Sequence, residues 1–106
     1  MAALRAHLLR QVASWAILFR RNSFALACYD RVLRDDPNEL ATLAQRAYLY
    51  AQSPSPADQQ RAIAEFERVV VLKPDDADSW FNLGFLSQQH GNLARAIAAF
   101  ERAVAL

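Results

Sequence analysis

Three aromatic residues recur in this sequence at a nearly constant spacing. Tyr29, Phe66 and Phe100 stand 37 and 34 residues apart, and an alanine precedes each of them by four positions. Pro37 and Pro74 repeat the step of 37 residues. Such a period indicates that the chain consists of stacked copies of one supersecondary unit, which leaves few folds open to it.

The pattern within each unit is helical. Apolar residues recur at steps of three and four, which is the period of an amphipathic helix. The 106 residues include only two glycines, too few to build many tight turns. The sequence therefore predicts six helices, at about 4–19, 23–34, 38–51, 56–72, 76–89 and 93–105.

The last unit has a specific signature. Trp80, Leu83 and Gly84 are spaced W-x-x-L-G, and Ala96 and Phe100 follow as A-x-x-x-F. This resembles the tetratricopeptide repeat, a helix-turn-helix unit of about 34 residues. The resemblance implies an all-α fold, a right-handed α-solenoid of three hairpins with six antiparallel helices. We expect a single domain over 1–106, with units at about 4–37, 38–74 and 75–106.

The middle unit holds three extra residues, within the stretch "AQSPSPADQQ" at 51–60. Ser55 can cap a helix, Pro56 suits its first turn, and Asp58 follows Ser55 by three positions. We therefore predict that the second helix of this unit begins early, near Pro56, instead of following a longer loop.

The front of the chain is basic and has no acidic residue before Asp30. The stretch "SWAILFRRNSFALAC", 14–28, resembles in part a secretory signal, a lipoprotein signal ending at Cys28, or a transit peptide. A membrane span is excluded, because the nine residues 11–19 reach only about 14 Å against a bilayer core of about 30 Å. The favoured interpretation is a helical hairpin that turns at 20–22 and places Cys28 inside. We expect a cytoplasmic protein.

No catalytic pattern is present. The chain has no Gly-rich phosphate loop and no Ser/His/Asp or Cys/His arrangement at a recognised spacing. One cysteine and two distant histidines do not form a metal-ligand pattern, and a net charge of +1 does not favour nucleic acid. We predict no enzyme activity, no cofactor, no metal and no membrane contact. An RNA-binding helical repeat is the alternative function.

The resemblance implies a protein-interaction scaffold whose first helices line a concave groove for a peptide or helix of a partner. The aromatic side chains expected in this groove either anchor the partner or contact a neighbouring helix. An acidic residue in the groove argues against a clamp for a C-terminal carboxylate. The groove candidates are Tyr48, Gln52, Asp78, Phe81, Asn82, Phe85 and Gln89, with Ala41, Ala44 and Gln45 beside them and Arg10, Ser14 and Ile17 in the first unit.

The sequence ends at "AFERAVAL", without a C-terminal capping helix after the third unit. Solenoid ends need a polar cap, yet Leu93, Ile97 and Val104 would be left partly open here. We expect a further repeat or a second subunit to cover this face, and a homodimer through it is one form of that prediction.

Overall fold

The computed structural model describes residues 2–106, and this part of the chain folds into six α-helices without a strand. The observed order agrees with an all-α helical-repeat solenoid. The helices are α1 (Ala2–Leu18), α2 (Asn22–Asp35), α3 (Leu40–Ala51), α4 (Pro56–Leu72), α5 (Ala77–Gln89) and α6 (Leu93–Ala105).

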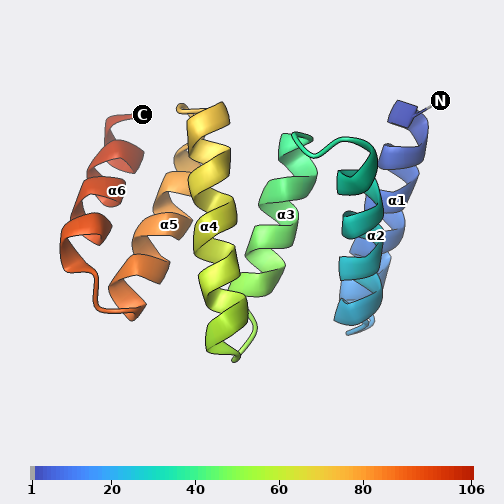
Figure 1. Ribbon diagram of the computed structural model, residues 1–106, viewed down its shortest axis with the longest axis horizontal. Helices are drawn as coiled ribbons and strands as arrows, with labels where there is room; N and C mark the ends of the chain where they lie inside the picture. Colours follow the sequence, from blue (N-terminus) through green and yellow to red (C-terminus); the bar gives the residue numbers. More distant parts are fainter. Residues whose placement is uncertain (1) are drawn as a thin grey trace.

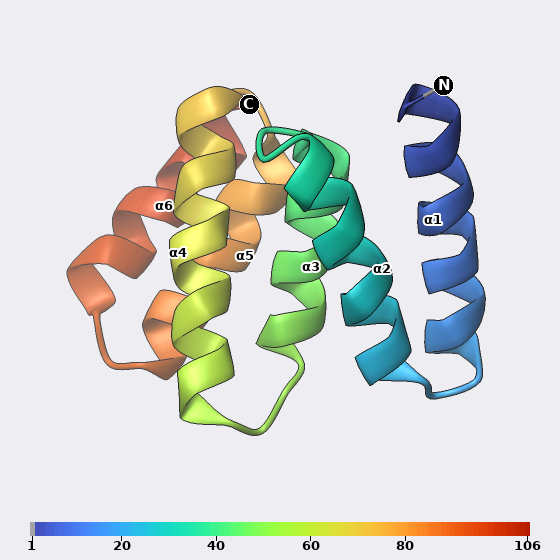
Figure 2. The same ribbon diagram turned by 45° about the vertical axis from the view of Figure 1, so that its right-hand side comes forward.

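The helices form a row of three antiparallel hairpins. α1 packs along α2, α3 along α4 and α5 along α6, while α2–α3 and α4–α5 contacts join successive hairpins. α1 and α6 lie at opposite ends of a body that measures 41 × 27 × 20 Å (Figure 1). Turning the molecule by 45° shows that α1 has a neighbour on one side only (Figure 2).

The helix starts follow side chains that cap them. Ser55 accepts a hydrogen bond from the backbone N–H of Asp58 (3.5 Å), and Pro56 is the first residue of α4, so the predicted early start is confirmed. Asp76 caps α5 by accepting a hydrogen bond from the N–H of Ser79 (3.3 Å). The third helix begins at Leu40, two residues after the approximate start predicted at 38. Its cap is the carboxylate of Glu39, which accepts from the N–H of Thr42 (2.9 Å).

The first turn of the chain is also as predicted. Arg20 has a positive φ of 59° and Arg21 precedes α2, so these residues reverse the chain between α1 and α2. Cys28 is buried against α1. No helix described between residues 2 and 106 is long and apolar enough to cross a bilayer.

The hydrophobic core crosses the boundaries between hairpins. Phe66 and Val70 of α4 cluster with Leu83 and Leu86 of α5, in the largest group of buried apolar side chains. A second cluster joins Leu49 of α3 to the buried residues of α1 and α2. Each hairpin therefore uses its neighbour to bury apolar surface, as solenoid units do.

Small residues mark where paired helices approach most closely. A Cβ atom added to Gly84 of α5 would lie 2.8 Å from the Phe100 ring of α6, closer than van der Waals contact allows. Ala13 and Ala47 hold the corresponding places in α1 and α3 and are fully buried. The W-x-x-L-G glycine therefore makes room for the aromatic residue of its own hairpin.

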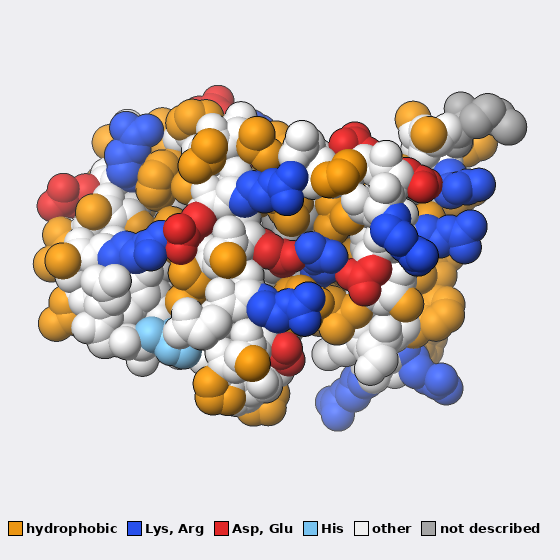
Figure 3. Space-filling model, viewed as in Figure 1, with side chains coloured by type: hydrophobic (Ala, Val, Ile, Leu, Met, Phe, Trp, Pro, Cys, Tyr) orange, Lys and Arg blue, Asp and Glu red, His pale blue; other side chains and the backbone are white. Residues whose placement is uncertain are grey.

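A band of charged side chains crosses the face where α4 and α2 lie in front (Figure 3). Arg46 of α3 donates to Asp30 of α2 (Nη1···Oδ1 2.8 Å) and to Glu65 of α4. The Arg61 guanidinium lies 4.7 Å from the centre of the Tyr50 ring. The ion pairs tie three helices of two hairpins together.

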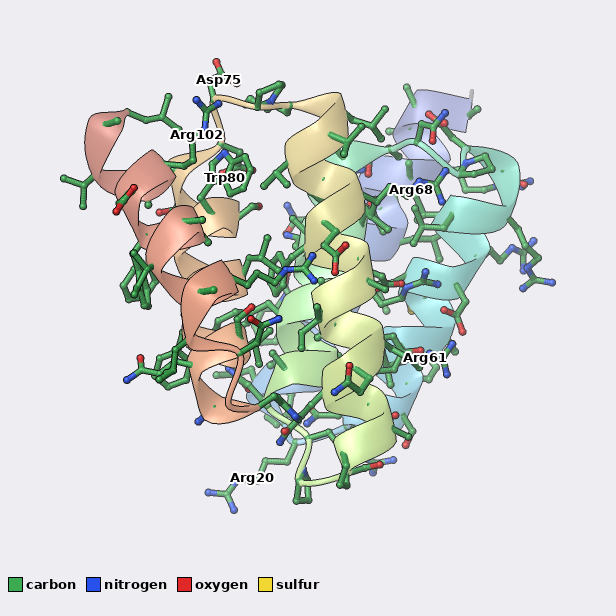
Figure 4. The ribbon with its side chains drawn as sticks, turned by 60° about the vertical axis from the view of Figure 1, so that its left-hand side comes forward. Arg20, Arg61, Arg68, Asp75, Trp80 and Arg102 are labelled. Carbon is green, nitrogen blue, oxygen red and sulfur yellow. The ribbon has the colours of Figure 1, made fainter. Side chains whose placement is uncertain are left out.

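The third hairpin has its own cation–aromatic contact. Figure 4 places Arg102 of α6 beside Trp80 of α5, and the guanidinium lies 5.3 Å from the ring centre. The Trp80 indole N–H donates to the carbonyl of Pro74 (2.8 Å). Trp80 is thus held by α6 on one side and by the loop before α5 on the other.

Candidate functional site

The first helices of the three hairpins line one shared hollow of about 600 Å³. Ser14 and Ile17 come from α1, and the buried rings of Tyr29 and Phe66, from α2 and α4, contribute to its floor. α3 contributes Ala44, Gln45, Tyr48, Leu49 and Gln52, whereas Asp76, Asp78, Ser79, Phe81 and Asn82 come from α5 and its cap. We call this hollow the groove.

The structure brings most of the predicted site residues together. Five of the seven principal candidates line the groove: Tyr48, Gln52, Asp78, Phe81 and Asn82. Phe85 lies in an adjoining hollow of about 270 Å³, which shares Tyr48, Gln52, Phe81 and Asn82 with the groove.

The remaining candidates lie elsewhere. Gln89 is exposed and lines neither hollow. Ala41 is exposed on α3 outside both. Arg10 forms an ion pair with Glu39 (3.2 Å) and lines a separate hollow against the end of α2. In the first unit, only Ser14 and Ile17 lie where the helical register predicts.

The three aromatic candidates are each about half exposed, between 48 and 54%. Phe81 also packs against Phe100 of α6, with ring centres 5.6 Å apart at an interplanar angle of 55°. Tyr48 and Phe85 make no aromatic contact with other rings of residues 2–106. We considered that these aromatics either anchor a partner or contact a neighbouring helix. Part of the Phe81 ring thus contacts a neighbouring helix.

The described residues that line the groove include two acidic side chains and no Lys, Arg or His. The acidic ones are Asp76 and Asp78. The Asp76 carboxylate accepts from the N–H and the hydroxyl of Ser79 (3.3 and 3.0 Å). Asp78 forms no hydrogen bond or ion pair with another described side chain. Its charge is therefore available to a ligand.

Several lining residues did not follow from the sequence. Tyr29 and Phe66, whose repeat positions indicated core, and Ser79, which the sequence did not single out, are all buried. Burial raises the pKa of the Tyr29 hydroxyl, which stays neutral at physiological pH. Asp76 caps α5 and also lines the groove. The sequence pattern does not predict the depth of the groove, because the register of a helix does not show how far a hollow extends between hairpins.

The fold agrees with comparisons to known proteins. The tetratricopeptide repeat family matches residues 54–106, half of the chain. The structure also resembles the second TPR of Spaghetti (RPAP3) bound to HSP90 peptide SRMEEVD, with a TM-score of 0.84 and 19% sequence identity. The match covers 96% of this chain and 86% of that one. No curated protein sequence matches significantly. The chain belongs to the tetratricopeptide repeat family.

Proposed function

We propose that the protein is a non-catalytic interaction scaffold whose groove binds a peptide or helix of a partner protein. The carrying observation is the groove itself, in which exposed Tyr48 and Phe81 stand beside amide side chains from two first helices. Exposed aromatics flanked by polar groups are typical of binding surfaces. The three hairpins, with units at about 4–37, 38–74 and 75–106, form one domain in this proposal.

The acidic side chains of the groove support the inference that the bound segment of the partner is not acidic. The similar solved domain is bound to the peptide SRMEEVD, which carries three acidic side chains. In this chain Asp78 would repel such a segment, and no Lys or Arg among the groove-lining residues described would attract it. The favoured ligand places an apolar side chain against Tyr48 and Phe85 and a neutral or basic residue near Asp78.

Selection from a random peptide library on the immobilised protein tests this function. We expect the selected peptides to carry an aromatic or large aliphatic residue and few acidic ones. Tyr48→Ala and Phe85→Ala should each weaken their binding by about 30-fold, the effect of losing a contact of about 2 kcal/mol. Fluorescence anisotropy with labelled peptides measures this change.

Phe24→Ala is the matched control, because Phe24 is an equally exposed aromatic on α2 that lines neither hollow. It should leave peptide affinity unchanged. The peptide SRMEEVD should show no saturable binding. Equal affinities of the wild type, Tyr48→Ala and Phe85→Ala would contradict binding in the groove.

We also propose self-association through the exposed apolar face of α6, where Leu93, Ile97 and Val104 are 58–87% exposed. Burial of this face would remove apolar surface from water. Light scattering should show a molecular mass that rises with protein concentration. A constant mass equal to that of the monomer would contradict it.

The proposed compartment is the cytoplasm. Fractionation of cells that produce the protein with a small epitope tag tests this location, and recovery in a membrane or organelle fraction would contradict it.

A further inference from the structure

The outer face of α1 carries a ridge of exposed apolar side chains. The ridge consists of five residues between 44 and 66% exposed, and its Trp15 and Phe19 rings stack with centres 5.9 Å apart. Their spacing of three and four residues places them on one side of the helix. The members of this α1 ridge are Leu4, Leu8, Val12, Trp15 and Phe19.

The repeat register shows what such a face packs against. Trp15 of α1 corresponds to Leu49 of α3 and Leu86 of α5, because Ala13, Ala47 and Gly84 hold equivalent places. Leu49 is buried against α1 and α2, and Leu86 against α3 and α4. Leu8 corresponds in the same way to Thr42 and Ser79, which are also buried. Trp15 and Leu8, in the middle of the α1 ridge, thus occupy positions that the other first helices bury.

The α6 face carries the complementary half of the same interface. Val104 corresponds to Val70 of α4 and Leu33 of α2, counted from the equivalent Phe100, Phe66 and Tyr29. Leu33 is buried with Leu43 of the following hairpin, and Val70 with Leu83 and Leu86 of its own following hairpin. We call Leu93, Ile97 and Val104 the α6 ridge.

The two ridges lie at opposite ends of the molecule, since α1 and α6 are the outermost helices (Figures 1 and 2). The contact between successive hairpins occurs twice within the structure, between the first and second hairpins and between the second and third. One side of an equivalent contact is exposed on α1 and the other side on α6. We propose that the α1 ridge of one copy packs onto the α6 ridge of a second copy, so that the solenoid continues head to tail. This inference rests on the self-association proposed above and is independent of peptide binding.

The charges beside the ridges support an apolar contact. Arg5 is paired with Asp35 (3.3 Å), and Arg95 is paired with Glu67, all within one chain. The side chains that form the two ridges are all apolar. Association should therefore persist in 0.5 M NaCl, because burial of apolar surface is not screened by salt.

A head-to-tail contact joins two different surfaces, so it is heterologous and does not close on two subunits. Two double variants separate it from a symmetric dimer. Leu8→Lys/Trp15→Lys blocks the α1 ridge, and Ile97→Lys/Val104→Lys blocks the α6 ridge. All four side chains are more than half exposed, so both variants should keep the helical circular dichroism of the wild type.

Sedimentation velocity should show wild-type protein forming dimers and larger species as its concentration rises. Each double variant alone should remain monomeric. An equimolar mixture of the two should form dimers and nothing larger, because each variant retains one intact ridge. This complementation is the specific signature of head-to-tail contact.

Other outcomes overturn the inference in distinguishable ways. If the α1-ridge variant associates like the wild type while the α6-ridge variant is monomeric and the mixture gives no heterodimer, the dimer is symmetric through α6. Wild-type protein that stays monomeric at every concentration overturns both this inference and the proposed self-association. Neither result bears on peptide binding in the groove, which the anisotropy experiment tests separately.

Discussion

Phe66→Ala is expected to lower the free energy of unfolding by about 3–5 kcal/mol, the range for removing a fully buried aromatic ring. The side chain is 1% exposed and contacts the core that α3, α4 and α5 share. The cavity left by the ring would therefore weaken the contact between two hairpins as well as the hairpin that carries it. Urea unfolding followed by circular dichroism measures the loss.

Phe24→Ala again serves as the control, since it removes the same atoms from a side chain that is mostly in solvent. Its effect should stay within about 0.5 kcal/mol. Equal losses in Phe66→Ala and Phe24→Ala would show that the shared core contributes little to stability.

Arg46→Met is expected to destabilise the fold by about 3 kcal/mol at pH 7, near the lower end of the range for breaking a buried ion pair. The variant leaves the Glu65 carboxylate without its partner, with 13% of that side chain exposed. It also removes the bond to Asp30 that ties α2 to α3. Arg68→Met is the control, because Arg68 is exposed and its one hydrogen bond within residues 2–106 goes to Asn38.

The penalty in Arg46→Met should shrink as the pH falls. Burial raises the pKa of Glu65, and the bond from Arg46 partly offsets that rise. Without Arg46, the pKa of Glu65 in the folded chain rises further above its unfolded value. A carboxyl of this kind stabilises the fold at low pH and loses that contribution as the pH rises through its folded pKa.

Urea unfolding at pH 7 and pH 4 compares the two conditions. The stability difference between wild type and Arg46→Met should be smaller at pH 4, where Glu65 of the variant is protonated. A difference of equal size at both pH values would mean that Glu65 is well solvated. In Arg68→Met, any loss should stay within about 0.5 kcal/mol at either pH.

Much of the fold could be predicted because the repeat period and the caps are local features. The step from Phe66 to Phe100 located two hairpins, and Ser55 with Pro56 located the start of α4. The cap of α3 was not predicted, because glutamate, which stands at 39, is a less common cap than Ser, Thr, Asp or Asn. The ion pairs of Arg46 were not predicted, since they depend on how three helices meet in space.

The groove was predicted in outline from the family resemblance, and helical register selected its candidate residues. Register placed Tyr48, Asp78 and Phe81 on one side of their helices, and the structure brings them to one hollow. It also placed Gln89 there, although α5 extends beyond both hollows by that point. A face is a property of one helix, whereas a hollow depends on the angle between hairpins, which the sequence pattern does not give.

The two rings in the floor of the groove also belong to the hydrophobic core of the solenoid. Tyr29 and Phe66 line the groove and also belong to the buried clusters that join adjacent hairpins. On the other side of the row, Arg46 joins the same hairpins through Asp30 and Glu65. The same contacts that stabilise the fold therefore also set the angle between hairpins, and with it the width of the groove.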